Sequence, residues 1–151
     1  MKKTQINAIK RIINNNPYRT ALQGVFIDDS GRACACDSYR VIRLTAENPA
    51  ELPTAPGLDV KRFFDVPRGW DLLLPTENEL KAIIKRSNET KTHAVYDFGD
   101  DLPAVNARYL LDILRIFPDA TAYRSKTNTK NGAVFFESTF GDALLMPIRK
   151  A

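Results

Sequence analysis

The order of predicted elements, a helix followed by strands near each end of the chain, most constrains what this sequence can fold into. Residues 5–15 place all of their isoleucines on one side of a helix. Near the other end, Asn106 can cap a second helix that stops before Pro118. From this recurrence we predict an α+β fold in which helices pack on antiparallel sheets, with two helix-plus-strands halves related by internal duplication.

Strand-like patterns occupy much of the remaining sequence and are separated by turn signals rich in Asp, Asn, Ser and Gly. The predicted strands are residues 21–27, 32–36, 40–45, 70–75, 92–98, 121–125, 133–138 and 143–148. A third helix is predicted after Thr76, which stands three residues before Glu79 in the pattern of a capping box. The sequence therefore predicts three helices and eight strands.

The length of 151 residues fits a single domain. We divide it into a first half (1–46), a connecting or inserted segment with one helix (47–100) and a second half (101–151). Prolines and glycines concentrate in residues 47–69, which predicts little regular structure there, and Phe63 and Phe64 are expected to anchor this stretch to the core.

Composition excludes several classes of protein. With 44% apolar and 26% charged residues, the chain is neither wholly disordered nor collagen-like. It has no apolar run of about 18 residues and no apolar segment of the secretory type near Met1, so we expect a soluble, cytoplasmic protein without membrane partners. The net charge of +4 permits a nucleic-acid partner, and the distribution of the charges decides whether they form a surface that can bind one.

Catalytic and metal-binding motifs are absent from the sequence, which contains no phosphate-binding loop, dinucleotide fingerprint or nucleophile elbow. His93 is the lone histidine, and we interpret it as a half-buried structural residue within a strand. Cys34 and Cys36 are two reduced core residues or, alternatively, half of a zinc site. We therefore predict a non-enzymatic protein with no catalytic residues, no metal and no cofactor.

Basic residues outnumber acidic ones on the polar faces of the three predicted helices. These candidate DNA-binding residues are Lys10, Arg11, Lys81, Lys85, Arg86, Arg108 and Arg115. If the helices lie side by side, they form a positive surface suited to phosphate contacts. The alternative is an ordinary solvated face, and Asp112 would neutralise part of it.

Two segments near the end of the chain resemble motifs of the bacterial sliding clamp, the β subunit of DNA polymerase III. Residues 105–114 (VNARYLLDIL) resemble its V-N-x-x-Y-L-L-D-x-L helix, and residues 143–149 (ALLMPIR) are similar to its V-V-M-P-M-R-L segment. Residues 34–41 (CACDSYRV), preceded by residues 22–27 (LQGVFI), resemble an earlier strand pair of that family, A-T-D-G-H-R-L after L-x-G-V-x-L.

The resemblance implies a processivity-clamp fold, with helices lining a basic inner surface around duplex DNA and sheets outside. The family has three such domains per chain, whereas this chain has length for one, so a ring would require a homo-oligomer or assembly with another protein. The compact chain suits a phage or mobile-element version of the clamp. Replication proteins that carry clamp-binding peptides are the further partners that the resemblance implies.

The family also binds those peptides in a cleft, and the corresponding positions here are Tyr39, Val41, Leu144, Met146 and Pro147. The alternative for Leu144 and Met146 is that they are ordinary strand residues of the core. Two functions therefore compete: a clamp-like protein that holds duplex DNA, and a protein-interaction module that keeps the fold without encircling DNA.

Overall fold

A computed structural model describes residues 1–45 and 52–151. Within these ranges the helices are α1 (Lys3–Asn14), α2 (Lys61–Phe64), α3 (Glu77–Thr90) and α4 (Ala107–Ile116), with a 3-10 turn at Thr20–Leu22. The strands are β1 (Phe26–Ile27), β2 (Ala33–Cys36), β3 (Arg40–Leu44), β4 (Arg68–Leu72), β5 (Val95–Asp97), β6 (Ala104–Asn106), β7 (Thr121–Ser125), β8 (Val134–Ser138) and β9 (Gly141–Leu145). The predicted α+β class is confirmed.

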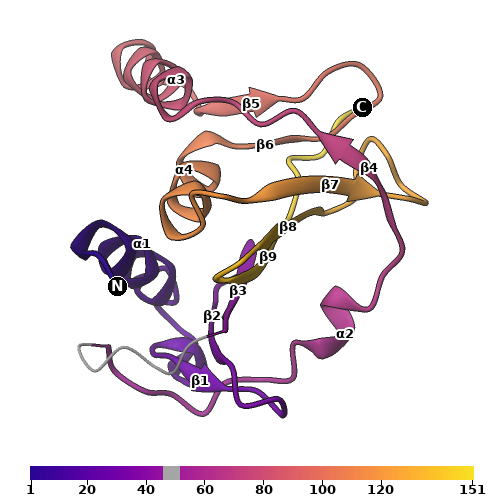
Figure 1. Cartoon of the computed structure of the whole chain (residues 1–151). Coiled ribbons are helices and arrows are strands. Elements are labelled where there is room, and N and C mark those ends of the chain that lie inside the picture. The colour runs from indigo at the N-terminus through magenta and orange to yellow at the C-terminus, as the bar shows by residue number, and fades with distance from the viewer. Residues whose placement is uncertain (46–51) are drawn as a thin grey trace.

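A seven-stranded antiparallel sheet with the order β1-β2-β3-β9-β8-β7-β4 forms the body of the structure. Its centre is the pair β3–β9, in which Val41 lies opposite Leu144 and Ile42 lies opposite Ala143. Residues 1–44 supply α1 and then β1–β3, and residues 107–145 supply α4 and then β7–β9, so the two ends of the chain meet in one sheet (Figure 1). Common topology does not establish common origin, and internal duplication stays a prediction.

One face of the sheet is covered by helices, with α1 beside α4 and α3 beside α4 (Figure 1). Strand residues alternate in direction, and those facing the helices, such as Ile42, Phe136 and Leu145, are fully buried. Ile9 and Ile12 of α1 and Leu110 of α4 complete this inner core. The apolar stripes predicted for the first and last helices are the surfaces that meet here.

The opposite face of the sheet carries a second, smaller core. Cys34 and Cys36 point to this side together with Val41 and Leu144, because they alternate with the residues of the inner core. Val60 and Phe64, at α2, close over them, and the preceding chain joins β1 through a parallel bridge between Val25 and Thr54. The expectation that Phe63 and Phe64 anchor their segment is confirmed, since Phe64 is buried in the outer core and Phe63 is partly buried against that core.

The middle of the chain extends both layers. Strand β4 adds to the sheet beside β7, helix α3 packs on α4, and β5 pairs with β6 in a separate two-stranded sheet. The N-cap residues predicted for these helices are present, although only one of the two hydrogen bonds of the predicted capping box forms. Thr76 accepts a hydrogen bond from the Glu79 amide at 3.1 Å, and Asn106 accepts one from the Arg108 amide at 2.9 Å.

Several element boundaries differ from the sequence predictions. Residues 21–25 are not a strand, because tertiary contacts hold this stretch: Asn16 donates a side-chain hydrogen bond to the Leu22 carbonyl, and Leu22 is buried against the outer core. The last strand stops at Leu145 instead of residue 148. The Met146 amide still donates to the Tyr39 carbonyl at 2.7 Å, but Pro147, the next residue, has no amide proton to donate. Residues 46–47, at the boundary of the first two predicted segments, lie outside the described residues.

Candidate nucleic-acid interface

A groove of about 450 Å³ runs between the exposed sides of α1, α4 and α3. Its position follows from the packing, because α1 and α4 bury their apolar stripes on the sheet, α3 packs on α4, and the three polar sides turn outward together. The residues that line the groove are Arg11, Lys81, Ile84, Lys85, Asn88, Arg108, Leu111, Asp112 and Arg115. Five of them are cationic and one, Asp112, is a carboxylate.

The structure thus brings together Arg11, Lys81, Lys85, Arg108 and Arg115 from three helices. The other two candidates do not line the groove. Lys10 is an exposed neighbour on α1, whereas Arg86 lines a different depression with Ser87, Thr90 and His93. Five of the seven candidate residues therefore line one groove, and their contact with DNA stays a prediction.

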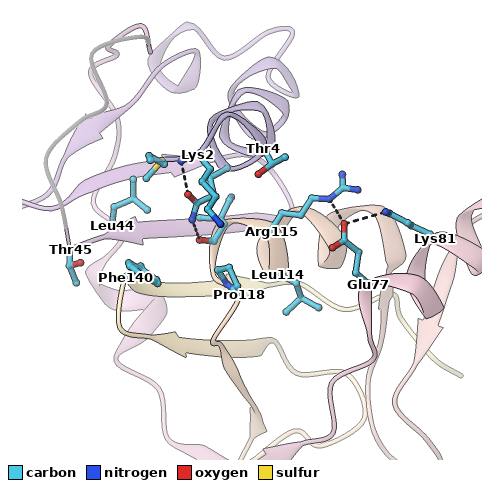
Figure 2. A pocket seen from close by; sticks show the side chains of 13 residues that line it. Lys2, Thr4, Leu44, Thr45, Glu77, Lys81, Leu114, Arg115, Pro118 and Phe140 are labelled. Carbon is cyan, nitrogen blue, oxygen red and sulfur yellow. Dashed lines mark hydrogen bonds and ion pairs between the residues drawn. The ribbon is translucent and has the colours of Figure 1, made fainter.

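The Glu77 carboxylate neutralises part of this positive charge at one end of the groove. Glu77 accepts a hydrogen bond from Arg115 Nε at 2.9 Å, and its carboxylate lies 3.7 Å from Lys81 Nζ (Figure 2). The hydrogen bond from Arg115 holds the pKa of the Glu77 carboxyl below its ordinary value. Glu77 is therefore ionised at neutral pH and competes with any other anion for these two cations.

The other end of the groove keeps its charge. Arg108 donates to the neutral amide oxygen of Asn88, which orients the guanidinium without neutralising its positive charge. Among the described residues, no carboxylate lies within ion-pair distance of Lys85 or Arg108. Lys85 and Arg108 are also exposed, so this end offers two cations to an external anion.

Beneath the groove lies a buried charge network that the sequence analysis did not single out. Arg40 of β3 donates to Asp112 at 2.9 Å and to Asp37 at 3.0 Å, and all three side chains are at most 7% exposed. The Arg40 guanidinium also stacks on the Tyr109 ring at 4.3 Å. The sequence does show Asp112 as the one acid on an otherwise basic helix face. Its partners could not be predicted, because they come from distant parts of the chain.

The residues proposed for a peptide cleft divide into two groups. Val41 and Leu144 face each other across β3 and β9 and are buried in the outer core, 5% and 6% exposed. Tyr39 and Met146 are about half exposed and joined by a backbone hydrogen bond. Met146 and Pro147 line a depression of about 410 Å³ with Asn128, Asn131 and Arg149.

The residues considered for catalysis or metal binding do not converge. Cys34 and Cys36 are buried free thiols, and burial raises their pKa values to about 12 and about 11, respectively. In the described ranges no three His, Cys, Asp or Glu side chains form a group that could hold a metal ion. The prediction for His93 is wrong. The His93 side chain is exposed and precedes β5, because pairing between β5 and β6 begins only at Val95.

Within residues 1–45 and 52–151, no helix combines the length and the apolar character needed to cross a membrane. Comparison with protein-family models, with curated proteins and with solved structures finds no match. The fold and the groove define the class of protein: an α+β chain in which one antiparallel sheet carries α1 and α4, α3 packs on α4, and cations of all three helices line one groove.

Proposed function

We propose that this chain is a non-enzymatic, sliding-clamp-like protein of the cytoplasm that associates with the backbone of duplex DNA and recruits replication proteins. The observation that carries the DNA proposal is the convergence of cations from α1, α3 and α4 on one groove that contains a single carboxylate, Asp112. Arg11 pairs with Asp112, and Lys81 and Arg115 pair with Glu77, so the charge that the groove offers to DNA is mainly that of Lys85 and Arg108. The motif resemblance to the bacterial clamp supports the same function independently.

The chemistry of the groove suits phosphate contacts and not base readout. Long, exposed side chains such as Lys85 and Arg108 can reach phosphate oxygens without a fixed register along the duplex. Binding through a few such contacts releases counterions and is therefore weak and steeply dependent on salt. Weak, register-free contacts are what a protein that slides on DNA requires.

Fluorescence anisotropy of a labelled duplex, titrated with the protein over a series of salt concentrations, tests this proposal. We expect Lys85→Glu with Arg108→Glu to lower the affinity at least about tenfold and to flatten the salt dependence. The matched control is Lys61→Glu with Arg62→Glu on α2, which makes the same change of charge at exposed positions away from the groove. Equal losses in both double variants would contradict a specific role of the groove.

The 151 residues form one clamp-like unit in this proposal, so encirclement of DNA by these residues alone requires several copies. Light scattering after size-exclusion chromatography, over a range of protein and salt concentrations, measures the assembly. A discrete oligomer large enough to close a ring supports a clamp. A 17.0 kDa monomer under all conditions contradicts self-assembled encirclement.

The second candidate function is a protein-interaction module or adaptor that does not encircle DNA. The observations that favour it are the exposure of Tyr39 and Met146 and the depression beside the end of β9 that Met146 and Pro147 line. Flexible Met side chains suit such a peptide site. This candidate predicts no salt-dependent DNA binding, together with binding of a labelled peptide that carries a clamp-binding motif, weakened by Met146→Ala.

A further inference from the structure

A cavity of about 1010 Å³ lies where the first turns of α1 and α3 meet the last turn of α4 and the turn between β8 and β9 (Figure 2). It adjoins the DNA-binding groove, because Lys81 and Arg115 line both. Nothing in the proposed contacts to DNA uses the remainder of its surface. The cavity therefore requires its own explanation.

The wall of the cavity is apolar. Phe140, in the turn between β8 and β9, leaves 53% of its surface exposed, and Leu114 and Pro118 line the cavity from the end of α4. Gln5 bridges the helices by donating to the Ile116 carbonyl, which satisfies one backbone acceptor at the end of α4. A ligand that fills this space must offer apolar groups, which a DNA backbone does not.

The rim of the cavity is positive. Lys2, Lys81 and Arg115 stand around it against one carboxylate, Glu77. The N-terminal ends of α1, at Lys2, and of α3, at Glu77, both lie at the cavity, and each helix is long enough to carry a positive dipole end there. The charge of the cavity thus favours an anionic ligand, while its wall favours an apolar one.

We propose that this cavity binds an acidic segment of a partner protein, with an apolar side chain of the segment against Leu114 and Phe140. Carboxylates of the segment pair with Lys2 at one side and with Arg115 at the other. Glu77 now occupies the position of such a carboxylate, since its oxygen lies 2.9 Å from Arg115 Nε and 3.7 Å from Lys81 Nζ. An incoming carboxylate can exchange with it, as one ion pair replaces another.

A fluorescein-labelled peptide library tests the proposal, with Glu or Asp at fixed positions and Leu, Ile, Met or Phe between them. Anisotropy is measured with the full chain, and the best-binding peptide is then located by amide shifts in nuclear magnetic resonance spectra. We expect Phe140→Ala and Lys2→Glu each to weaken this peptide about tenfold. The matched controls are Tyr18→Ala, which removes an exposed aromatic elsewhere, and Lys3→Glu, which reverses a neighbouring charge outside the cavity.

Other results would overturn the proposal. No binding by any library member excludes an acidic peptide ligand, and equal losses in target and control variants exclude this cavity as its site. Competition by unlabelled duplex DNA would assign the cavity to the DNA surface, and self-association abolished by Phe140→Ala would assign it to a second copy. Failure of the DNA proposal is distinguishable, because Lys85→Glu with Arg108→Glu leaves peptide binding unchanged.

Discussion

Asp112 of α4 accepts a hydrogen bond from the buried guanidinium of Arg40 of β3, with 2.9 Å between Asp112 Oδ2 and Arg40 Nη1. The other oxygen of the same carboxylate accepts from Arg11 Nε of α1 at 2.7 Å. One carboxylate therefore ties α1 and α4 to strand β3 of the sheet. It also means that the acid of the cationic groove is already paired from below, so it subtracts less from the charge offered to DNA.

We expect Asp112→Ala to lower the free energy of unfolding by about 3 kcal/mol, because it leaves Arg40 short of a partner where its side chain is 2% exposed. Urea unfolding followed by circular dichroism measures the change. Arg11→Ala is the matched control. It removes the other partner of Asp112. Because the Arg11 side chain is 47% exposed, this change should lower the free energy of unfolding by less than about 1 kcal/mol. Similar losses in both variants would show that burial of Arg40 is not what makes the network costly to break.

Glu77→Gln is expected to strengthen duplex binding by a few-fold, since it frees Arg115 and Lys81 at the neutralised end of the groove. The slope of affinity against salt should become steeper at the same time. Anisotropy titrations measure both quantities. Glu89→Gln, an exposed change of the same charge on α3 away from the groove lining, serves as the control. An unchanged salt slope in Glu77→Gln would mean that this end of the groove does not meet DNA.

The dependence of the free energy of unfolding on pH below neutrality should also change in Glu77→Gln. The pKa of Glu77 is lowered in the folded chain by the hydrogen bond from Arg115, so the pair stabilises the fold above the ordinary pKa of a glutamate. That contribution is lost as the pH falls through the folded value. Urea unfolding between neutral pH and about pH 3 should therefore show a smaller loss in the variant than in the wild type. Parallel curves would contradict a lowered pKa.

We expect the two buried thiols to make the stability of the fold decrease at alkaline pH. Burial raises the pKa of Cys34 to about 12 and that of Cys36 to about 11, above the value of an unfolded thiol. Their contribution to stability is complete below about pH 8.5 and declines as the pH rises, because the unfolded chain loses these protons first. Unfolding measured from pH 7 to pH 10.5 should show this decline, and Cys34→Ala with Cys36→Ala should reduce its slope. A thiol reagent should react with the native chain only slowly.

Gly141 is expected to tolerate no side chain. Its φ is +145°, and a Cβ there would lie 1.9 Å from the carbonyl oxygen of Arg43 on the paired strand. Gly141→Ala should therefore separate β3 from β9 and cost more than about 3 kcal/mol. Gly31→Ala is the control, because Gly31 has a φ of +83° with open space around it and should cost only about 1 kcal/mol. Thermal unfolding compares the two, and equal costs would contradict the steric argument.

The elements that could be predicted from the sequence are those whose signals are local. The helix with Asn106 at its cap, the alternation at Cys34 and Cys36, and the basic helix faces all depend on residues a few positions apart. The 3-10 turn at Thr20–Leu22, where the sequence predicts the start of a strand, could not be predicted in this way. Asn16 and the chain near Thr54, rather than local preference, determine the path of that stretch.

The sequence by itself determined the class of fold, the three longer helices and the existence of cationic helix faces, because periodicity, caps and charge depend on neighbouring residues. It did not predict the short helix α2. Only the tertiary structure decided which cations meet. It placed Lys85 and Arg108 in one groove and turned Arg86 away from it. The physical reason is that helix α3 can bury its apolar stripe on α4 in one orientation, and that packing, formed between residues far apart in the chain, selects the side chains that face α1 and α4.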